Sequence, residues 1–287
     1  MDINKFIDDN DFATPKELPY AQWVNPQNDG CGLGIIASQA DLAGFKPSSE
    51  WKKEKITFGS SEEEIYISQE PRLIILNGAG TIDAKTKGIA NPLYMHNKAT
   101  GEKTFFEKDK YYSDKENWTV YRPLLFFPVS QDNEILSATP FVFNMKRVSH
   151  RSLYDVYQNQ WIPQLLNAYK VQGINFPQGK RPTCSFLARN VFEPIIQKSK
   201  LQALNSNATS AAAVCTGFKQ INFEKVAIPL DSPVSGVIKD YLANLMDLIA
   251  LKNKPQEEAK LAVVEVDPDD FTDDNGEVHL PLDALPF

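Results

Sequence analysis

The sequence predicts an α+β fold that is mainly β, followed by a disordered acidic tail. Short β-type runs separated by turn residues extend from about residue 50 to residue 147. The apolar spacing then changes to three and four residues over 149–171, which is the period of a helix. The C-terminal end is rich in carboxylates and too poor in apolar residues to pack. We therefore expect a lead-in over residues 1–30, a folded body over 31–255 and a flexible tail over 256–287.

Charge is unevenly distributed over the 287 residues. The chain carries 30 Lys and Arg against 37 Asp and Glu, a net charge of -7. From Glu257 onward there are ten acidic residues and the single Lys260, so the tail carries about -9 and the rest of the chain about +2. The acidic character of the protein therefore lies in its tail, outside the expected core.

Composition favours a folded, β-rich body. Hydrophobic residues make up 42% of the chain, and its 17 Phe, 10 Tyr and 4 Trp are residue types that strands prefer. The N-terminus lacks the apolar segment of a secretion signal, and no run approaches the roughly eighteen apolar residues of a membrane span. The widely spaced Cys31, Cys184 and Cys215 fit a reducing compartment. We expect a cytoplasmic protein without a membrane partner.

A glycine cluster over residues 30–34 follows the lead-in. It has the spacing GxGxG, no GK[ST] follows it, and the residues before it do not form a buried strand pattern. Two interpretations stay open: a phosphate-binding loop, or a flexible turn that enters the apolar residues 35–37.

The β-type runs come next. Residues 55–58 and 64–67 flank Gly59-Ser60-Ser61, which is the spacing of a hairpin. Further runs lie at 72–76, 93–96, 103–106, 118–129 and 141–146. We expect an antiparallel region with Phe126 and Phe127 in its core, because these two lie in an unbroken apolar run.

Helices and more strands complete the body. The helix over 149–171 has Ser149 as its expected cap, Gly173 as its stop and a kink near Pro163. Residues 182–196 and 221–228 read as strands around a polar loop, and a second helix covers about 233–252. Several strands, one helix and then more strands is the element order of an OB-fold. The predicted fold is therefore an OB-fold-like antiparallel barrel with extra strands and two helices.

The last residues, 267–287, combine carboxylates with an apolar tip. The tip is Leu285-Pro286-Phe287, and acid precedes it at Asp283 and at Asp269, Asp270, Asp273 and Asp274. A terminal Phe held by a proline of fixed φ can enter a small pocket while its carboxylate meets an Arg or Lys. The alternative is an acidic tail that ends in Phe by chance.

This ending resembles that of bacterial and phage single-stranded DNA-binding proteins, which commonly close an acidic tail with a short apolar tip, often Pro-Phe. The resemblance covers about twenty residues, and residues 278–282 separate most of the acids from the tip, which is a departure from the family pattern. It implies an OB-type body that binds single-stranded DNA. It also implies that Asp283, Leu285, Pro286 and Phe287 recruit replication, recombination or repair proteins.

Single-strand binding needs aromatic rings for the bases and cations for the phosphates. Several stretches interleave the two. We predict that nucleic acid is bound by Trp51, Lys52, Lys53, Lys55, Tyr66, Lys110, Tyr111, Tyr112, Trp118, Tyr121, Arg122, Lys146, Arg147 and Arg189. Trp and Tyr are preferred to Phe because they tolerate one exposed edge, although each ring has a place in the core as its alternative. The tail is expected to compete with nucleic acid for these cations.

Signals for catalysis are weak. His96, His150 and His279 stand apart without metal-ligand spacing, so we expect no metal, no cofactor and no enzymatic activity. Two rival functions stay open. One is a phage- or plasmid-derived interaction module. The other is a metal-dependent nucleic-acid-processing enzyme, with Asp83, Asp114 and Asp132 among its candidate ligands. The sequence also leaves open whether the chain forms a homo-oligomer and whether it prefers DNA or RNA.

Overall fold

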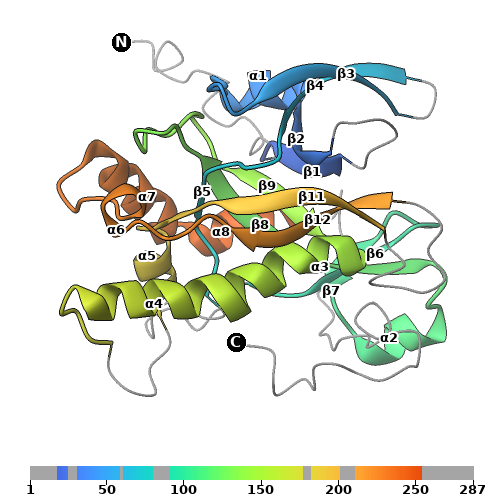
Figure 1. Ribbon diagram of the computed structural model, residues 1–287. Coiled ribbons are helices and arrows are strands. Elements are labelled where there is room, and N and C mark those ends of the chain that lie inside the picture. The colour runs from blue at the N-terminus through green and yellow to red at the C-terminus, as the bar shows by residue number, and fades with distance from the viewer. Residues whose placement is uncertain are drawn as a thin grey trace, which may run out of the picture.

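The computed structural model describes residues 18–24, 31–58, 61–79, 91–176, 182–200 and 211–253. These residues form an α+β fold that is mainly β, as predicted (Figure 1). The strands are β1 (Tyr20–Val24), β2 (Gly32–Ile36), β3 (Lys52–Phe58), β4 (Ser61–Ser68), β5 (Leu73–Ile75), β6 (Tyr94–Asn97), β7 (Lys103–Phe105), β8 (Trp118–Pro128), β9 (Phe141–Met145), β10 (Val191–Phe192), β11 (Pro194–Lys200) and β12 (Ala211–Phe218). The predicted tail lies outside the described residues.

One large sheet organises the fold. Its strands follow the order β10-β5-β8-β9-β1-β2-β4-β3, with β6 pairing with β8 and with β7. Strands β11 and β12 form a separate two-stranded sheet. The predicted hairpin is confirmed, since β3 pairs antiparallel with β4 and Phe58 lies opposite Ser61. The runs expected around 72, 93, 103, 118 and 141 are also confirmed as strands.

The predicted antiparallel barrel is wrong. Over the described residues the sheet is open, because its path ends at β10 on one side and at β3 on the other. Strand β1 pairs in parallel with β9, so the sheet is mixed. The N-terminal strand therefore takes the place beside β9, and β2, β4 and β3 extend the sheet outward from it instead of closing it.

The glycine cluster contributes to β2 and not to a flexible turn. Gly32 and Gly34 lie in a fully buried strand between β1 and β4. A Cβ added to Gly34 would lie 2.6 Å from Ile65 Cδ1, so only a glycine permits this close approach. A Cβ added to Gly32 would collide with the Ser68 carbonyl oxygen, so packing explains both glycines.

The described helices are more numerous than the two that were predicted. They are α1 (Ala37–Ala43), α2 (Lys108–Ser113), α3 (Arg147–Asp155), the π-helical η2 (Val156–Trp161), α4 (Ile162–Val171), α5 (Cys184–Leu187), α6 (Phe223–Val226), α7 (Pro233–Ala243) and α8 (Leu245–Asn253). Figure 1 shows α3 and α4 as one long rod, with α5 to α7 towards one end of the molecule and α2 towards the other.

The long helix is irregular where the sequence places Pro163. The helix begins at Arg147, so Ser149 is not its cap, and a π-helical turn precedes the proline. Pro163 has no N–H and crowds the carbonyl four residues earlier, and the wider π turn accommodates both effects. The predicted stop is confirmed, because Gly173 has a φ of 80° and Ile174 N–H donates to the Tyr169 carbonyl at 3.0 Å.

Three predictions after residue 180 are wrong at least in part. The strand expected over 182–196 is confirmed only in its second half by β10 and β11, because Cys184–Leu187 is a short helix. Phe223–Val226 is also a short helix, and the expected last helix is divided into α7 and α8 at Asn244. Side-chain caps explain the helical starts. Thr183, Asn222 and Ser232 each accept a hydrogen bond from a backbone N–H two or three residues ahead.

The core lies between the large sheet and the helices. Phe126 and Phe127 are completely buried, as predicted. A second, smaller cluster gathers Leu93, Met95, Phe106, Tyr111, Trp118 and Val120 between α2 and one face of β6 and β8. This cluster leaves the other face of β6 and β8 for a different set of residues.

Candidate nucleic-acid interface

Four of the predicted stacking rings are buried. Trp51, Tyr111, Trp118 and Tyr121 are at most 5% exposed. Trp51 packs edge-on against Phe45, with ring centroids 5.3 Å apart. Rings buried to this extent leave no open face on which a base can stack, so the prediction that they are exposed platforms is wrong. Their aromatic surface stabilises the core, which is the alternative that the sequence left open.

The predicted cations on the β3–β4 hairpin are offset by glutamates. Lys53 Nζ lies 2.6 Å from Glu64 Oε2, and Lys55 Nζ lies 3.8 Å from Glu62 Oε2. The hydrogen bond from Lys53 also lowers the pKa of Glu64. Cross-strand pairing therefore makes this hairpin a surface of mixed charge. The exposed Lys52 and the half-buried Tyr66 belong to the same hairpin.

A second group of predicted residues lies on the α2 side of the sheet. Lys110 Nζ is 2.5 Å from Glu102 Oε1 and 5.1 Å from the centroid of the Trp118 ring. Tyr112 is 42% exposed and is the only predicted ring among the described ones that is classed as exposed. Lys110 is therefore already paired with a carboxylate.

The remaining predicted arginines are scattered. Arg122 is buried, with its guanidinium carbon 5.0 Å from the Tyr154 ring centroid. Arg189 lines a cleft between α5 and α7. Arg147 begins α3, and its side chain lies outside the described part. The predicted set is thus distributed over several separate surfaces, and only Tyr121 and Lys146 belong to the face described next.

Strands β6, β7 and β8 present a row of aromatic rings on the face opposite α2. Residues directly opposite each other in an antiparallel pair point to the same side. Tyr94 of β6 lies opposite both Phe105 of β7 and Tyr121 of β8. The ring planes are stacked, with centroids 4.8 Å apart for Tyr94 and Phe105 and 5.9 Å apart for Tyr94 and Tyr121. Phe105 is the half-buried member of this row, whereas the two tyrosines are buried.

Cations flank the aromatic row. His96 lies two residues after Tyr94 and is opposite Lys103 of β7 and Thr119 of β8, so these three share the face of the rings. Lys146, directly after β9, places its Nζ 5.8 Å from the Tyr121 ring centroid. We call these residues the β6–β8 face, which consists of Tyr94, His96, Lys103, Phe105, Thr119, Tyr121 and Lys146.

The electrostatics of the β6–β8 face favour an anion. Burial, Lys146 and Lys103 lower the pKa of His96, in that order of importance. His96 is therefore neutral at pH 7 in the free protein, and the positive charge around it is supplied by two lysines. A phosphate placed among these three side chains would gain from both ammonium groups and would favour protonation of the imidazole.

Five members of this face were absent from the predicted site: Tyr94, His96, Lys103, Phe105 and Thr119. Tyr94, His96, Lys103 and Phe105 belong to the β6–β7 hairpin. Its signal in the sequence is the pair of runs 93–96 and 103–106 around a turn that includes Gly101, which has a φ of 75°. Once these runs are paired in register, His96 meets Lys103 and Tyr94 meets Phe105.

The carboxylates of the enzyme alternative do not meet among the described residues. Asp114 accepts a hydrogen bond from Asn117 Nδ2 at 2.8 Å, Asp132 lies in an exposed turn, and Asp83 is outside the described part. No group of three or more His, Cys, Asp or Glu side chains in the described ranges is arranged to hold a metal ion. Among the helices described, none has the length and apolarity needed to cross a membrane.

Comparisons with known proteins give a family without an activity. The family model described as a domain of unknown function, DUF5895, matches residues 15–257. No curated protein and no solved structure matches the chain. The match covers every strand and helix described above, including the β6–β8 face.

Proposed function

We propose a function for this chain, which belongs to the DUF5895 family of unknown function, from the chemistry of its β6–β8 face. The protein binds single-stranded DNA without sequence preference and catalyses no reaction. The observation that carries the proposal is the stacked row Phe105–Tyr94–Tyr121 with Lys103, Lys146 and His96 beside it. Its three cysteines are buried and form no disulfide, which favours a cytoplasmic setting.

In this proposal the bases and the phosphates of the strand contact different side chains. The half-buried Phe105 and the His96 ring offer aromatic surface for bases, and the buried tyrosines hold Phe105 in place from behind. Lys103 and Lys146 neutralise phosphates. Contacts of this kind carry no sequence information, because every base has a π face and every nucleotide a phosphate.

The acidic tail has a separate role in this proposal. Asp283, Leu285, Pro286 and Phe287 lie outside the described residues. Seven carboxylates and no Lys or Arg occur between residues 267 and 287, which steers the segment towards basic partner surfaces. We propose that these residues recruit replication, recombination or repair proteins to the bound strand.

The test is a fluorescence-anisotropy titration of a labelled dT oligomer of about 30 nucleotides, long enough for one binding site. The full chain is expected to bind at low salt, and its affinity falls as salt is raised. Lys103→Gln/Lys146→Gln removes two phosphate contacts, so it should weaken binding and make the slope of log K against log salt shallower by about 1.4.

A matched variant controls for net charge. Lys53→Gln/Lys55→Gln also removes two positive charges, but from the glutamate-paired β3–β4 hairpin, and should leave binding close to that of the unchanged chain. Equal losses in the two variants would contradict the β6–β8 face as the site. Absence of binding at low salt would contradict the function itself. A parallel titration with a uridine oligomer measures the preference for DNA over RNA.

Binding is also expected to tighten as the pH falls from 8 to 6. In the free protein the pKa of His96 is lowered by burial and by Lys146 and Lys103. A bound phosphate raises this pKa, so the complex takes up a proton and gains affinity as the pH falls through the pKa of the bound form. Each unit of difference between the bound and free pKa is worth about tenfold in affinity. His96→Gln should flatten the pH profile, and an unchanged profile in this variant would exclude His96.

A further inference from the structure

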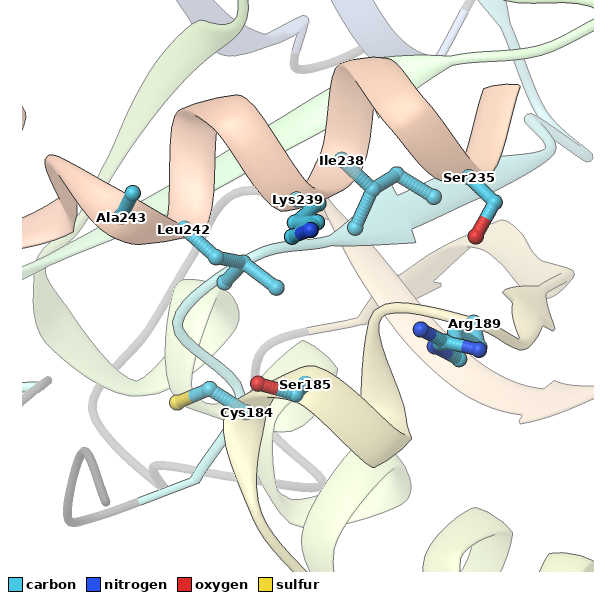
Figure 2. Close-up of a pocket in the computed structure, with 8 residues that line it drawn as sticks. All are labelled: Cys184, Ser185, Arg189, Ser235, Ile238, Lys239, Leu242 and Ala243. Atoms are coloured by element: carbon cyan, nitrogen blue, oxygen red, sulfur yellow. The ribbon is translucent and has the colours of Figure 1, made fainter. Parts of the chain in front are cut away.

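A cleft between α5 and α7 has the chemistry of a site for an acidic, partly apolar peptide. It has a volume of about 250 Å³ and is lined from one side by Cys184, Ser185 and Arg189 and from the other by residues of α7, including Ser235, Ile238 and Lys239 (Figure 2). The cleft is separate from the β6–β8 face, since Figure 1 shows α5 and α7 at the opposite end of the fold from β6 and β7.

Two cationic side chains that line this cleft form no ion pair with a carboxylate of the described residues. In the described ranges, neither Arg189 nor Lys239 forms an ion pair, whereas Lys53, Lys110 and Lys219 each do. None of the residues that line the cleft is acidic. In Figure 2 the Ser235 hydroxyl points down towards the side of the cleft where Arg189 lies. Guanidinium, ammonium and hydroxyl groups together are the donors that carboxylates bind.

The other half of the cleft is apolar. Cys184 on the α5 side and Ile238 on the α7 side are each 2% exposed, and Leu242 and Ala243 continue the apolar lining along α7. Ligand sites for small molecules usually have volumes of roughly 300–1,000 Å³. This cleft is smaller, so it fits one or two side chains, of which one is apolar and another is anionic.

The chain itself contains a segment of this character. Residues 267–287 include seven carboxylates and no Lys or Arg, and apolar residues stand beside them, as in Asp270-Phe271 and Asp283-Ala284-Leu285. The segment follows α8, which itself follows α7 directly. Thirteen residues separate Asn253 from Asp267, and extended chain spans about 3.3–3.6 Å per residue, so this linker can reach over about 40 Å.

We infer that the acidic segment 267–287 docks in the α5–α7 cleft of its own chain, with a carboxylate between Arg189 and Lys239 and a neighbouring apolar side chain against Ile238. Docking neutralises the cations and covers the apolar lining of the cleft at once. It is independent of nucleic-acid binding, because it uses different residues. When docked, the segment is withheld from other proteins, so the cleft regulates the recruitment proposed above.

Photo-crosslinking in the full chain tests this directly. Phe271→p-benzoylphenylalanine and Phe287→p-benzoylphenylalanine each place a crosslinker in the segment, and mass spectrometry identifies the peptide it captures. We expect capture within one chain of peptides that contain Cys184–Leu187 and Arg189 or Pro233–Ala243. The yield should fall with rising salt, because exposed ion pairs are screened.

The charge variant Arg189→Gln/Lys239→Gln should lose the crosslink, whereas Lys53→Gln/Lys55→Gln should retain it. Circular dichroism tests whether both variants keep their fold, and Lys239→Gln alone replaces the double variant if Arg189 is necessary for folding. Crosslinks to β6, β7 or β8, crosslinks that join two chains, or equal yields in the two variants would each overturn the inference. The dT titration is read separately, so failure here leaves the nucleic-acid proposal intact.

Discussion

Replacing Arg72 by Met is expected to lower the free energy of unfolding by about 3–5 kcal/mol, the cost of breaking a buried ion pair from one side. The Arg72 side chain is 1% exposed, and its Nε donates to Glu193 Oε1 at 2.9 Å. Its Nη2 donates to Asn133 Oδ1 at 2.9 Å and to the Lys225 carbonyl at 3.2 Å, and its Nη1 donates to the Ser130 carbonyl.

This guanidinium joins elements that are distant in the sequence. Arg72 directly precedes β5, Ser130 and Asn133 belong to the turn after β8, Glu193 connects β10 to β11, and Lys225 lies in α6. Methionine fills a similar volume but supplies no donor. The Glu193 carboxylate and Asn133 Oδ1 then lose the guanidinium, and each group left unpaired costs free energy. The Ser130 and Lys225 carbonyls keep hydrogen bonds from the Asn133 N–H and Nδ2.

Urea denaturation followed by circular dichroism measures the change, and a surface pair serves as the control. Lys219 Nζ lies 2.8 Å from Glu70 Oε2, but the side chains are 36% and 53% exposed. Lys219→Met should therefore cost only about 0–1 kcal/mol. Comparable losses in the two variants would show that Arg72 is not the link between these elements.

The strands could be predicted because their signals are local. Alternation and turn chemistry located the β3–β4 hairpin, β5 and the strands from β6 to β9. Their assembly could not be predicted in the same way. The parallel pairing of β1 with β9 joins Tyr20 to Val142, and nothing within either strand marks that partner. An open sheet and a closed barrel have the same strand pattern, so only this long-range pairing distinguishes them.

Helix starts in the C-terminal third were missed because apolar content was given more weight than capping residues. Residues 182–196 and 221–228 contain enough Phe, Val and Ile to resemble strands. Thr183 and Asn222 precede their helices and accept a backbone N–H in each case. A side-chain oxygen that satisfies one otherwise unpaired donor is a small contribution, but it decides short segments of four residues.

The residues predicted to bind nucleic acid do not form one surface. Interleaved rings and cations are visible in the sequence, yet composition cannot tell which rings are buried or which lysines face a glutamate. Trp118 and Tyr121 are three residues apart on β8 and therefore point to opposite faces. Only the register of β6 with β7 brings His96 and Lys103 together.

Gly78→Ala is expected to cost about 3 kcal/mol, towards the upper end of the range for overpacked cores. A Cβ at this position would collide with the Tyr157 hydroxyl and lie 2.7 Å from its Cε1. The Tyr157 ring has no room to withdraw. It is stacked on Trp161 with centroids 4.9 Å apart, it meets Phe192 edge-on at 5.1 Å, and all three rings are at most 1% exposed.

Two variants make this prediction specific to the collision. Gly236 lies in α7 with nothing within 4 Å of an added Cβ, so Gly236→Ala should stabilise the protein by about 0.5–1 kcal/mol through helix propensity.

The Tyr157 hydroxyl has no hydrogen-bond partner among the described residues, so Tyr157→Phe removes the nearest colliding atom without breaking a hydrogen bond. Gly78→Ala should therefore cost less in the Tyr157→Phe background than alone. Thermal unfolding of the unchanged protein, the two single variants and the double variant measures this coupling. Additive losses would mean that the added methyl group is accommodated by movement of the backbone and not resisted by the Tyr157 ring.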